Sequence, residues 1–223
     1  MARFGIREEE RVTLSHLDLY GPSLATGSEK ALLHARLKLS RDALVWKLEG
    51  LGDAAVRKPM TETATNLIGL VKHLTRLEAQ YFCHAFDRPR PTLAWESDED
   101  AKLGHPSDMY ARPEERVEDL ISDYHAACAA ADRTIEDLDL DTTGRHPFAG
   151  VTVSLRWMLL NVLLDTARHA GHADIIREQI DGSAGGGRGR ELPKDGEFWS
   201  TYRARVSGEI DTEAWMAFIR ARS

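Results

Sequence analysis

The chain has 223 residues, 42 % of them hydrophobic, and its 29 basic against 36 acidic side chains give a net charge of -7. This length favours one sizeable core, and the negative charge argues against nucleic-acid binding, because no overall positive field would attract a phosphate backbone. The apolar runs are too short for a membrane span, and the first residues lack the apolar core of a signal peptide. Only two cysteines are present, Cys83 and Cys128, which suits a reducing compartment. We therefore expect a cytoplasmic protein without membrane or nucleic-acid partners.

Two helices are predicted in the first part of the chain. Residues 29–49 place leucines on one helical stripe, with Ser28 as N-cap and Gly50 as the stop. A second helix is predicted from a Thr65 cap to Phe86. His73 lies in the middle of this second helix.

A polar, proline-containing connection over residues 87–112 is too long for a tight turn and is expected to cross the molecule. A third helix is predicted from Pro113 to Leu138, because proline and the glutamates after it suit a helix N-terminus. After the connection over residues 139–153, Ser154 is expected to cap a long fourth helix that ends at Asp181-Gly182.

The predicted fold is all-α, because no alternating strand pattern persists apart from a short pairing near Val151 and Val153. Four helices with one long second connection predict a four-helix bundle over residues 1–182. Residues 183–223 are predicted to form a Gly-rich linker and a C-terminal helical extension around Trp215. Aromatic side chains in this extension suggest that it packs on the bundle.

The fourth helix carries metal-ligand spacing. Residues four apart in a helix lie about 40° apart around its axis, so Asp165 and His169 project together, and His172 falls on the same stripe. Helical bundles build metal sites from facing helices, and His73 on the second helix is the candidate third ligand. Three protein ligands leave one coordination position open, as in catalytic rather than structural zinc sites.

Several segments together resemble the mini-circle protein branch of the DinB-like superfamily, which includes relatives of mycothiol-dependent metalloenzymes. These segments are Leu44-Val-Trp-Lys-Leu-Glu-Gly-Leu51, Leu67-Ile-Gly-Leu-Val-Lys-His-Leu74, Ser154-Leu-Arg-Trp157 and Ala167-Arg-His-Ala-Gly-His-Ala-Asp-Ile-Ile-Arg-Glu-Gln-Ile-Asp-Gly182. The resemblance covers residues 12–182. It implies a DinB-like bundle with up-down-down-up connectivity.

The resemblance also implies a metal site formed by His73, Asp165 and His169. The branch usually carries Glu where this chain has Asp165, and a His is common where it has Asn161. The shorter carboxylate predicts a weaker, rearranged or lost site. His172 is interpreted as lining or supporting the site, because the wider superfamily often has Gln there.

The resemblance implies a divalent-metal-dependent enzyme that uses a low-molecular-weight thiol such as mycothiol. Zinc is the first choice of metal, with nickel and iron left open, because mixed His and carboxylate ligands suit several ions. A metal-bound thiol is ionised and can attack a small electrophile, which predicts an S-transferase or a thiol-assisted isomerase. The alternative is a non-catalytic small-molecule-binding relative whose metal site is weakened or lost. Metal-dependent hydrolysis is a third reading, but the sequence offers no evident general base for it.

Further predictions concern the surroundings of this site. Arg156 and Arg168 flank it and could bind a substrate carboxylate, although an ion pair on the helix surface is the more frequent role of a single Arg. In the long second connection, a lid over the open end of the bundle is predicted from Trp95, His105 and Asp108. The sequence does not determine the substrate, the identity of the thiol or whether the protein forms a homodimer.

Overall fold

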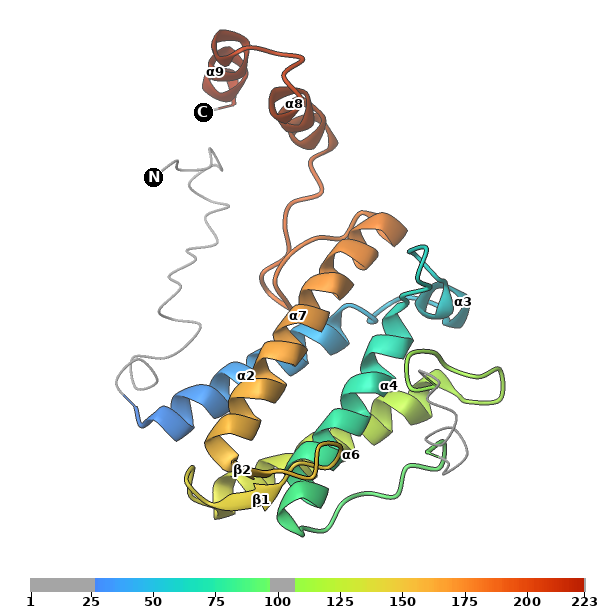
Figure 1. Ribbon diagram of the computed structural model, residues 1–223. Helices are drawn as coiled ribbons and strands as arrows, with labels where there is room; N and C mark the ends of the chain where they lie inside the picture. The colour runs from blue at the N-terminus through green and yellow to red at the C-terminus, as the bar shows by residue number, and fades with distance from the viewer. Residues whose placement is uncertain (1–26, 97–106, 223) are drawn as a thin grey trace.

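The computed structural model describes residues 27–96 and 107–222, and this part of the chain is mostly helical, which confirms the all-α class (Figure 1). Its α-helices are α2 (Glu29–Trp46), α3 (Asp53–Arg57), α4 (Leu67–Glu78), α6 (Val117–Asp137), α7 (Leu155–Asp181), α8 (Gly196–Val206) and α9 (Thr212–Ala221). Within these residues, no helix is both long and apolar enough to cross a membrane.

The local capping signals place several helix ends where they were predicted. Ser28 and Ser154 accept hydrogen bonds from the first turns of α2 and α7, and Gly182 ends α7 with a φ of 73°. The start of α4 differs by one residue, because the side chain of Asn66 rather than Thr65 caps it. Helix α6 begins at Val117 rather than Pro113, since the Glu115 carboxylate is bonded to Lys72 and Arg112 instead of serving a helix N-terminus.

The second predicted helix changes its geometry before it ends. After α4 the chain continues as a π-helical turn, η2 (Ala79–Cys83), and a 3-10 turn, η3 (His84–Phe86). A π-helical turn re-aims the side chains after it, and such turns are frequent at functional sites. Here the π-turn contains Tyr81, whose ring lies beside those of His146 and Phe148, with centroids 5.3 and 5.8 Å away.

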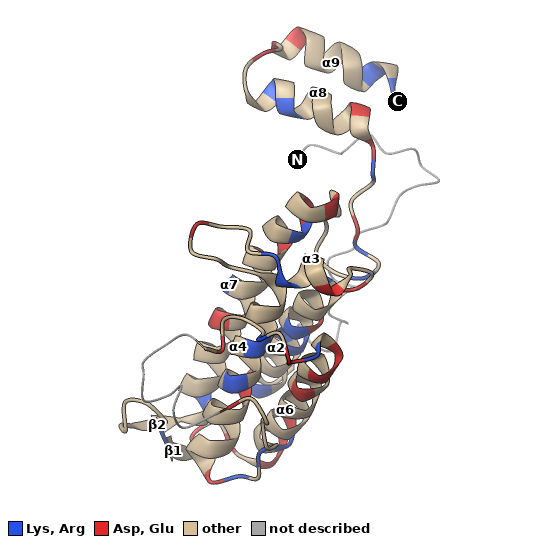
Figure 2. Ribbon diagram, turned by 90° about the vertical axis from the view of Figure 1, so that its right-hand side faces the viewer, with Lys and Arg blue, Asp and Glu red and all other residues tan. Residues whose placement is uncertain are grey.

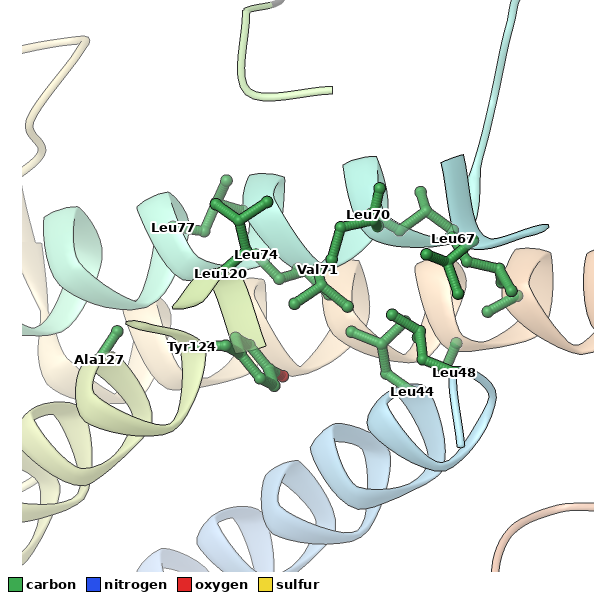
Figure 3. Packing of buried hydrophobic residues seen from close by; sticks show 14 of the residues in the cluster. Leu44, Leu48, Leu67, Leu70, Val71, Leu74, Leu77, Leu120, Tyr124 and Ala127 are labelled. Atoms are coloured by element: carbon green, nitrogen blue, oxygen red, sulfur yellow. The ribbon is translucent and has the colours of Figure 1, made fainter. Parts of the chain in front are cut away.

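The four longest helices pack together as α2 against α7, α4 against α6, and α4 against α7. Leucines from α2 and α4 and the Tyr124 ring of α6 meet in the core between them (Figure 3). Burying each such side chain contributes about 1.5–3 kcal/mol. This core fixes α4 and α7 side by side, and both predicted halves of the metal site are on these two helices.

The short strand pairing was predicted near the right place. Strand β1 (Thr143–Arg145) pairs antiparallel with β2 (Thr152–Ser154), and Gly144 faces Val153. Gly144 lies against the end of η3, where a Cβ atom would stand 2.3 Å from the carbonyl oxygen of Ala85. Because the hairpin lies so close to η3, its tip places Phe148 beside Tyr81.

The C-terminal extension forms a helical hairpin of α8 and α9 rather than the single helix predicted around Trp215. Its aromatic rings contact one another, among them Phe198 with Tyr202, Trp215 and Phe218. Both views place the hairpin beyond the end of the main helical body, so the expected packing of this extension on the bundle is not seen (Figures 1 and 2). The mutual contacts of the hairpin account for the aromatic residues that suggested such packing.

Gly69 on α4 is required by the close approach of the segment around Met109. A Cβ atom at position 69 would lie 1.9 Å from the Met109 carbonyl oxygen. We expect Gly69→Ala to lower the free energy of unfolding by about 1–3 kcal/mol in denaturant titrations, because one of the two segments must move. A Gly69→Ala protein as stable as the parent would contradict the close contact between position 69 and Met109.

Gly171 on α7 provides the matched control, because a Cβ atom there meets nothing within 4 Å. Alanine is preferred to glycine inside a helix by about 0.5–1 kcal/mol, so Gly171→Ala is expected to raise the stability slightly. Opposite signs for the two substitutions separate the steric effect at Gly69 from helix propensity.

Candidate metal centre

The two packed helices bring the three predicted ligands together. His73 of α4 and the pair Asp165 and His169 of α7 each offer one ligand atom, and these three atoms lie within 4.8 Å of one another. Asp165 Oδ2 lies 3.6 Å from His73 Nε2 and 3.6 Å from His169 Nε2. The shorter carboxylate of Asp165 therefore reaches both imidazoles equally.

The two separations through Asp165 fit a small divalent cation. With metal–ligand bonds of about 2.1 Å, two ligands of a tetrahedral site lie about 3.4 Å apart. The two edges through Asp165, at 3.6 Å each, are close to this value. The nitrogen and oxygen ligands suit zinc, and they also suit nickel or iron, so the donor set does not identify the metal.

Asp108 holds the ring of His73 in its orientation. The Nδ1–H group of His73 donates to Asp108 Oδ2 at 3.0 Å, which leaves Nε2 pointing toward Asp165. Burial lowers the pKa of His73, but the hydrogen bonds and charges of Asp108 and Asp165 outweigh burial and raise this pKa to about 9. A carboxylate behind an imidazole is the arrangement that typically orients a metal-binding histidine. The site is thus one in which positive charge is stabilised.

His172 lies behind the other imidazole. Its Nδ1 is 3.4 Å from Nδ1 of His169, and the His169 Nε2 faces Asp165. Burial and the neighbouring His73 lower the pKa of His169, although Asp165 acts in the opposite direction. A neutral imidazole is the form that binds metal. His172 therefore contacts a candidate ligand, and its supporting role stays a prediction.

A pocket of about 390 Å³ opens beside His73 and Asp165. Asn161, Arg168 and Arg76 are among the residues that line it. Its apolar lining is formed by Leu77, Tyr81, Phe148 and Leu164. Arg156 does not line this pocket, because its guanidinium pairs with Glu29 and Asp141 on the surface.

A comparison with known families identifies the family of this chain. The profile of the mycothiol-S-transferase family matches residues 32–182, which is more than half of the chain. The chain belongs to the mycothiol-S-transferase family. This membership confirms the DinB-like resemblance, and the matched region ends at Gly182, where α7 ends.

No curated protein matches this member of the mycothiol-S-transferase family. Among solved structures, a conserved protein from Enterococcus faecalis is similar to it with 15 % sequence identity and a TM-score of 0.48, over 70 % of this chain and 99 % of that one.

The prediction that Trp95 helps to form a lid is wrong. Trp95 is buried in the core and its Nε1–H donates to Asp123, so it covers no opening. Asp108 lines the pocket and accepts a hydrogen bond from His73, and His105 is outside the described residues. Sequence reasoning missed Arg76, although its position one helical turn after His73 was a usable signal.

Proposed function

We propose that the protein is a divalent-metal-dependent thiol S-transferase or thiol-assisted isomerase. It would bind a low-molecular-weight thiol of the mycothiol type and join the sulfur to a small electrophilic substrate. The observation that carries this proposal is the His73, Asp165 and His169 cluster at the edge of a pocket, in a member of the mycothiol-S-transferase family. Zinc is the metal proposed first.

In this proposal His73, Asp165 and His169 would hold the cation through three ligand atoms at the edge of the pocket. The cation, when bound, lowers the pKa of a thiol so that it ionises at neutral pH. Asp108 and His172 keep the two imidazoles oriented. The side chains of Leu77, Phe148 and Leu164 form an apolar part of the pocket lining.

The transfer step balances without an oxidant or reductant. The S–H proton of the thiol passes to solvent, and a sulfur electron pair forms a bond to the electrophilic carbon. The bond from that carbon to its leaving group breaks, and the leaving group takes the electron pair. In an isomerase, the thiol would add to the substrate and be released again.

The experiment combines metal analysis with a conjugation assay. Protein purified without added metal is measured by elemental analysis, and then incubated with zinc, a chlorobimane and each of mycothiol, bacillithiol and glutathione. We expect metal-dependent conjugation with at least one thiol, and its loss in Asp165→Asn. Stoichiometric metal without conjugation by any thiol would overturn the proposed S-transferase activity. Absence of metal would instead favour the non-catalytic binding relative.

The family membership also supports an inference about architecture. We infer the up-down-down-up four-helix bundle from α2, α4, α6 and α7, with residues 1–182 as the functional unit and residues 183–223 as an extension. A chain truncated after Gly182 should then keep its metal and its unfolding transition. A cytoplasmic location and a homodimer stay predictions from the sequence, which cell fractionation and gel filtration can check.

A further inference from the structure

Arg76 on α4 is a cationic side chain whose hydrogen-bonding capacity is not used within the described residues. Its Nε atom is buried without a hydrogen-bond partner. The nearest carboxylates are too far for hydrogen bonds, since Asp108 Oδ2 lies 3.7 Å from Nη1 and Glu96 Oε1 lies 3.8 Å from Nε. A buried donor without a partner is costly, so such a group is a candidate for ligand binding.

Both neighbouring carboxylates are engaged by other donors. Asp108 accepts from His73, and Glu96 accepts from Gln80 and Arg90. Arg76 therefore forms two long ion pairs with these carboxylates but no hydrogen bond to either. The Phe148 ring faces its guanidinium at 5.7 Å, which further fixes the plane of the group.

The guanidinium belongs to the pocket beside the candidate metal centre, because Arg76, Phe148, His73 and Asp165 all line it. Arg76 follows His73 by three residues on α4, as Arg168 follows Asp165 by three residues on α7. Residues three apart share a helix face. Each helix thus presents one ligand and one arginine toward the same space.

The charge of the pocket favours an anionic ligand. Its lining includes two carboxylates, Asp108 and Asp165, and two guanidiniums, Arg76 and Arg168. These four charges cancel, so a bound divalent cation would leave the pocket positive. A planar guanidinium matches the geometry of a carboxylate through two parallel hydrogen bonds.

We propose that Arg76 binds a carboxylate of the small molecule that accepts the thiol, which makes the acceptor a carboxylate-bearing electrophile. This inference rests on the proposed function and adds the chemical class of the substrate. A pocket of about 390 Å³ holds a small molecule of this kind. Arg76 anchors the carboxylate, and the electrophilic carbon lies toward the open metal position.

The test uses bifunctional probes on the full chain loaded with cobalt(II), whose thiolate charge-transfer band reports sulfur binding. The probes are mercaptoacetate and its two next longer homologues, each compared with its methyl ester. We expect the parent protein to bind at least one acid about tenfold or more tightly than its ester, as a charge-assisted hydrogen bond provides. In Arg76→Gln this preference should disappear while ester affinity stays unchanged. Arg76→Lys should keep part of the preference.

Arg168→Gln is the matched control, because it removes the same charge from the same pocket at a side chain that is 68 % exposed. It should reduce the preference for acids by no more than about threefold, since an exposed charge is screened by solvent. Equal effects of the two substitutions would mean that overall charge, not hydrogen bonding by Arg76, selects the acid. That result would overturn the proposal.

Failure of this inference can be distinguished from failure of the proposed function. Equal binding of acids and esters by the parent protein overturns the carboxylate site while the thiol site stands. If neither acids nor esters give a charge-transfer band, the thiol site fails. Calorimetry of benzoate against benzamide then tests Arg76 alone, and the absence of benzoate binding overturns the carboxylate site too.

Discussion

Asp165→Asn is expected to lower the affinity for zinc by at least about a hundredfold, because it removes the only anionic ligand of the proposed site. The amide keeps the size of the side chain, so the helical circular-dichroism signal should not change. Competition with a chelator measures the affinity, and elemental analysis measures the bound metal. The loss should be large because Asp165 Oδ2 lies 3.6 Å from both imidazole nitrogens and connects the two helices.

Two comparison variants sharpen this experiment. Glu178→Gln makes the same carboxylate-to-amide change at an exposed position of α7 and should leave zinc affinity unchanged. Asp165→Glu introduces the residue that the family resemblance leads one to expect, and it should still bind zinc. An Asp165→Asn protein that retains zinc with the parent affinity would show that the three clustered residues are not the ligands.

Site residues that are close together in the sequence could be predicted more easily than those that only the fold brings together. Asp165 and His169 are four residues apart on one helix, so their convergence follows from helix geometry. His73 was predicted as the third ligand from the facing helices of a bundle and from the family resemblance. The packing of α4 against α7 brings His73 close to Asp165 and His169. Asp108 could not be assigned as the partner of His73, because it lies within the predicted connection over residues 87–112, whose path no local pattern determines.

For the fold as well, features determined within one helical turn were predicted, and features that depend on distant contacts were not. Ser28, Ser154 and Gly182 mark helix ends through bonds within one turn, and these ends were predicted. The π-turn over Ala79–Cys83 was not predicted, because its apolar residues continue the pattern of a regular helix. The hairpin of α8 and α9 was missed in part because its aromatic residues indicated burial but did not identify what they would contact.

The buried ion pair of Arg41 and Glu78 joins α2 to the end of α4. Glu78 is fully buried, and both of its carboxylate oxygens accept from Arg41, at 2.7 and 2.6 Å. Arg41 also donates to Asp132 of α6 at 2.6 Å. Burial raises the pKa of Glu78, while the charge and hydrogen bonds of Arg41 oppose this change. Each buried charge of the pair is therefore compensated by the other.

Glu78→Ala is expected to destabilise the protein by about 3–5 kcal/mol in denaturant unfolding, because it leaves the Arg41 guanidinium buried with only part of its compensating charge. The double variant Arg41→Met with Glu78→Leu removes both charges and fills the space with apolar atoms. Its stability should be much closer to that of the parent, since two desolvation costs disappear together with the attraction. Equal losses in the single and double variants would indicate that the attraction itself, rather than the unpaired charge, dominates. Recovery in the double variant would show that this pair adds little net stability and that its main effect is to align α2, α4 and α6, the alignment on which the position of His73 depends.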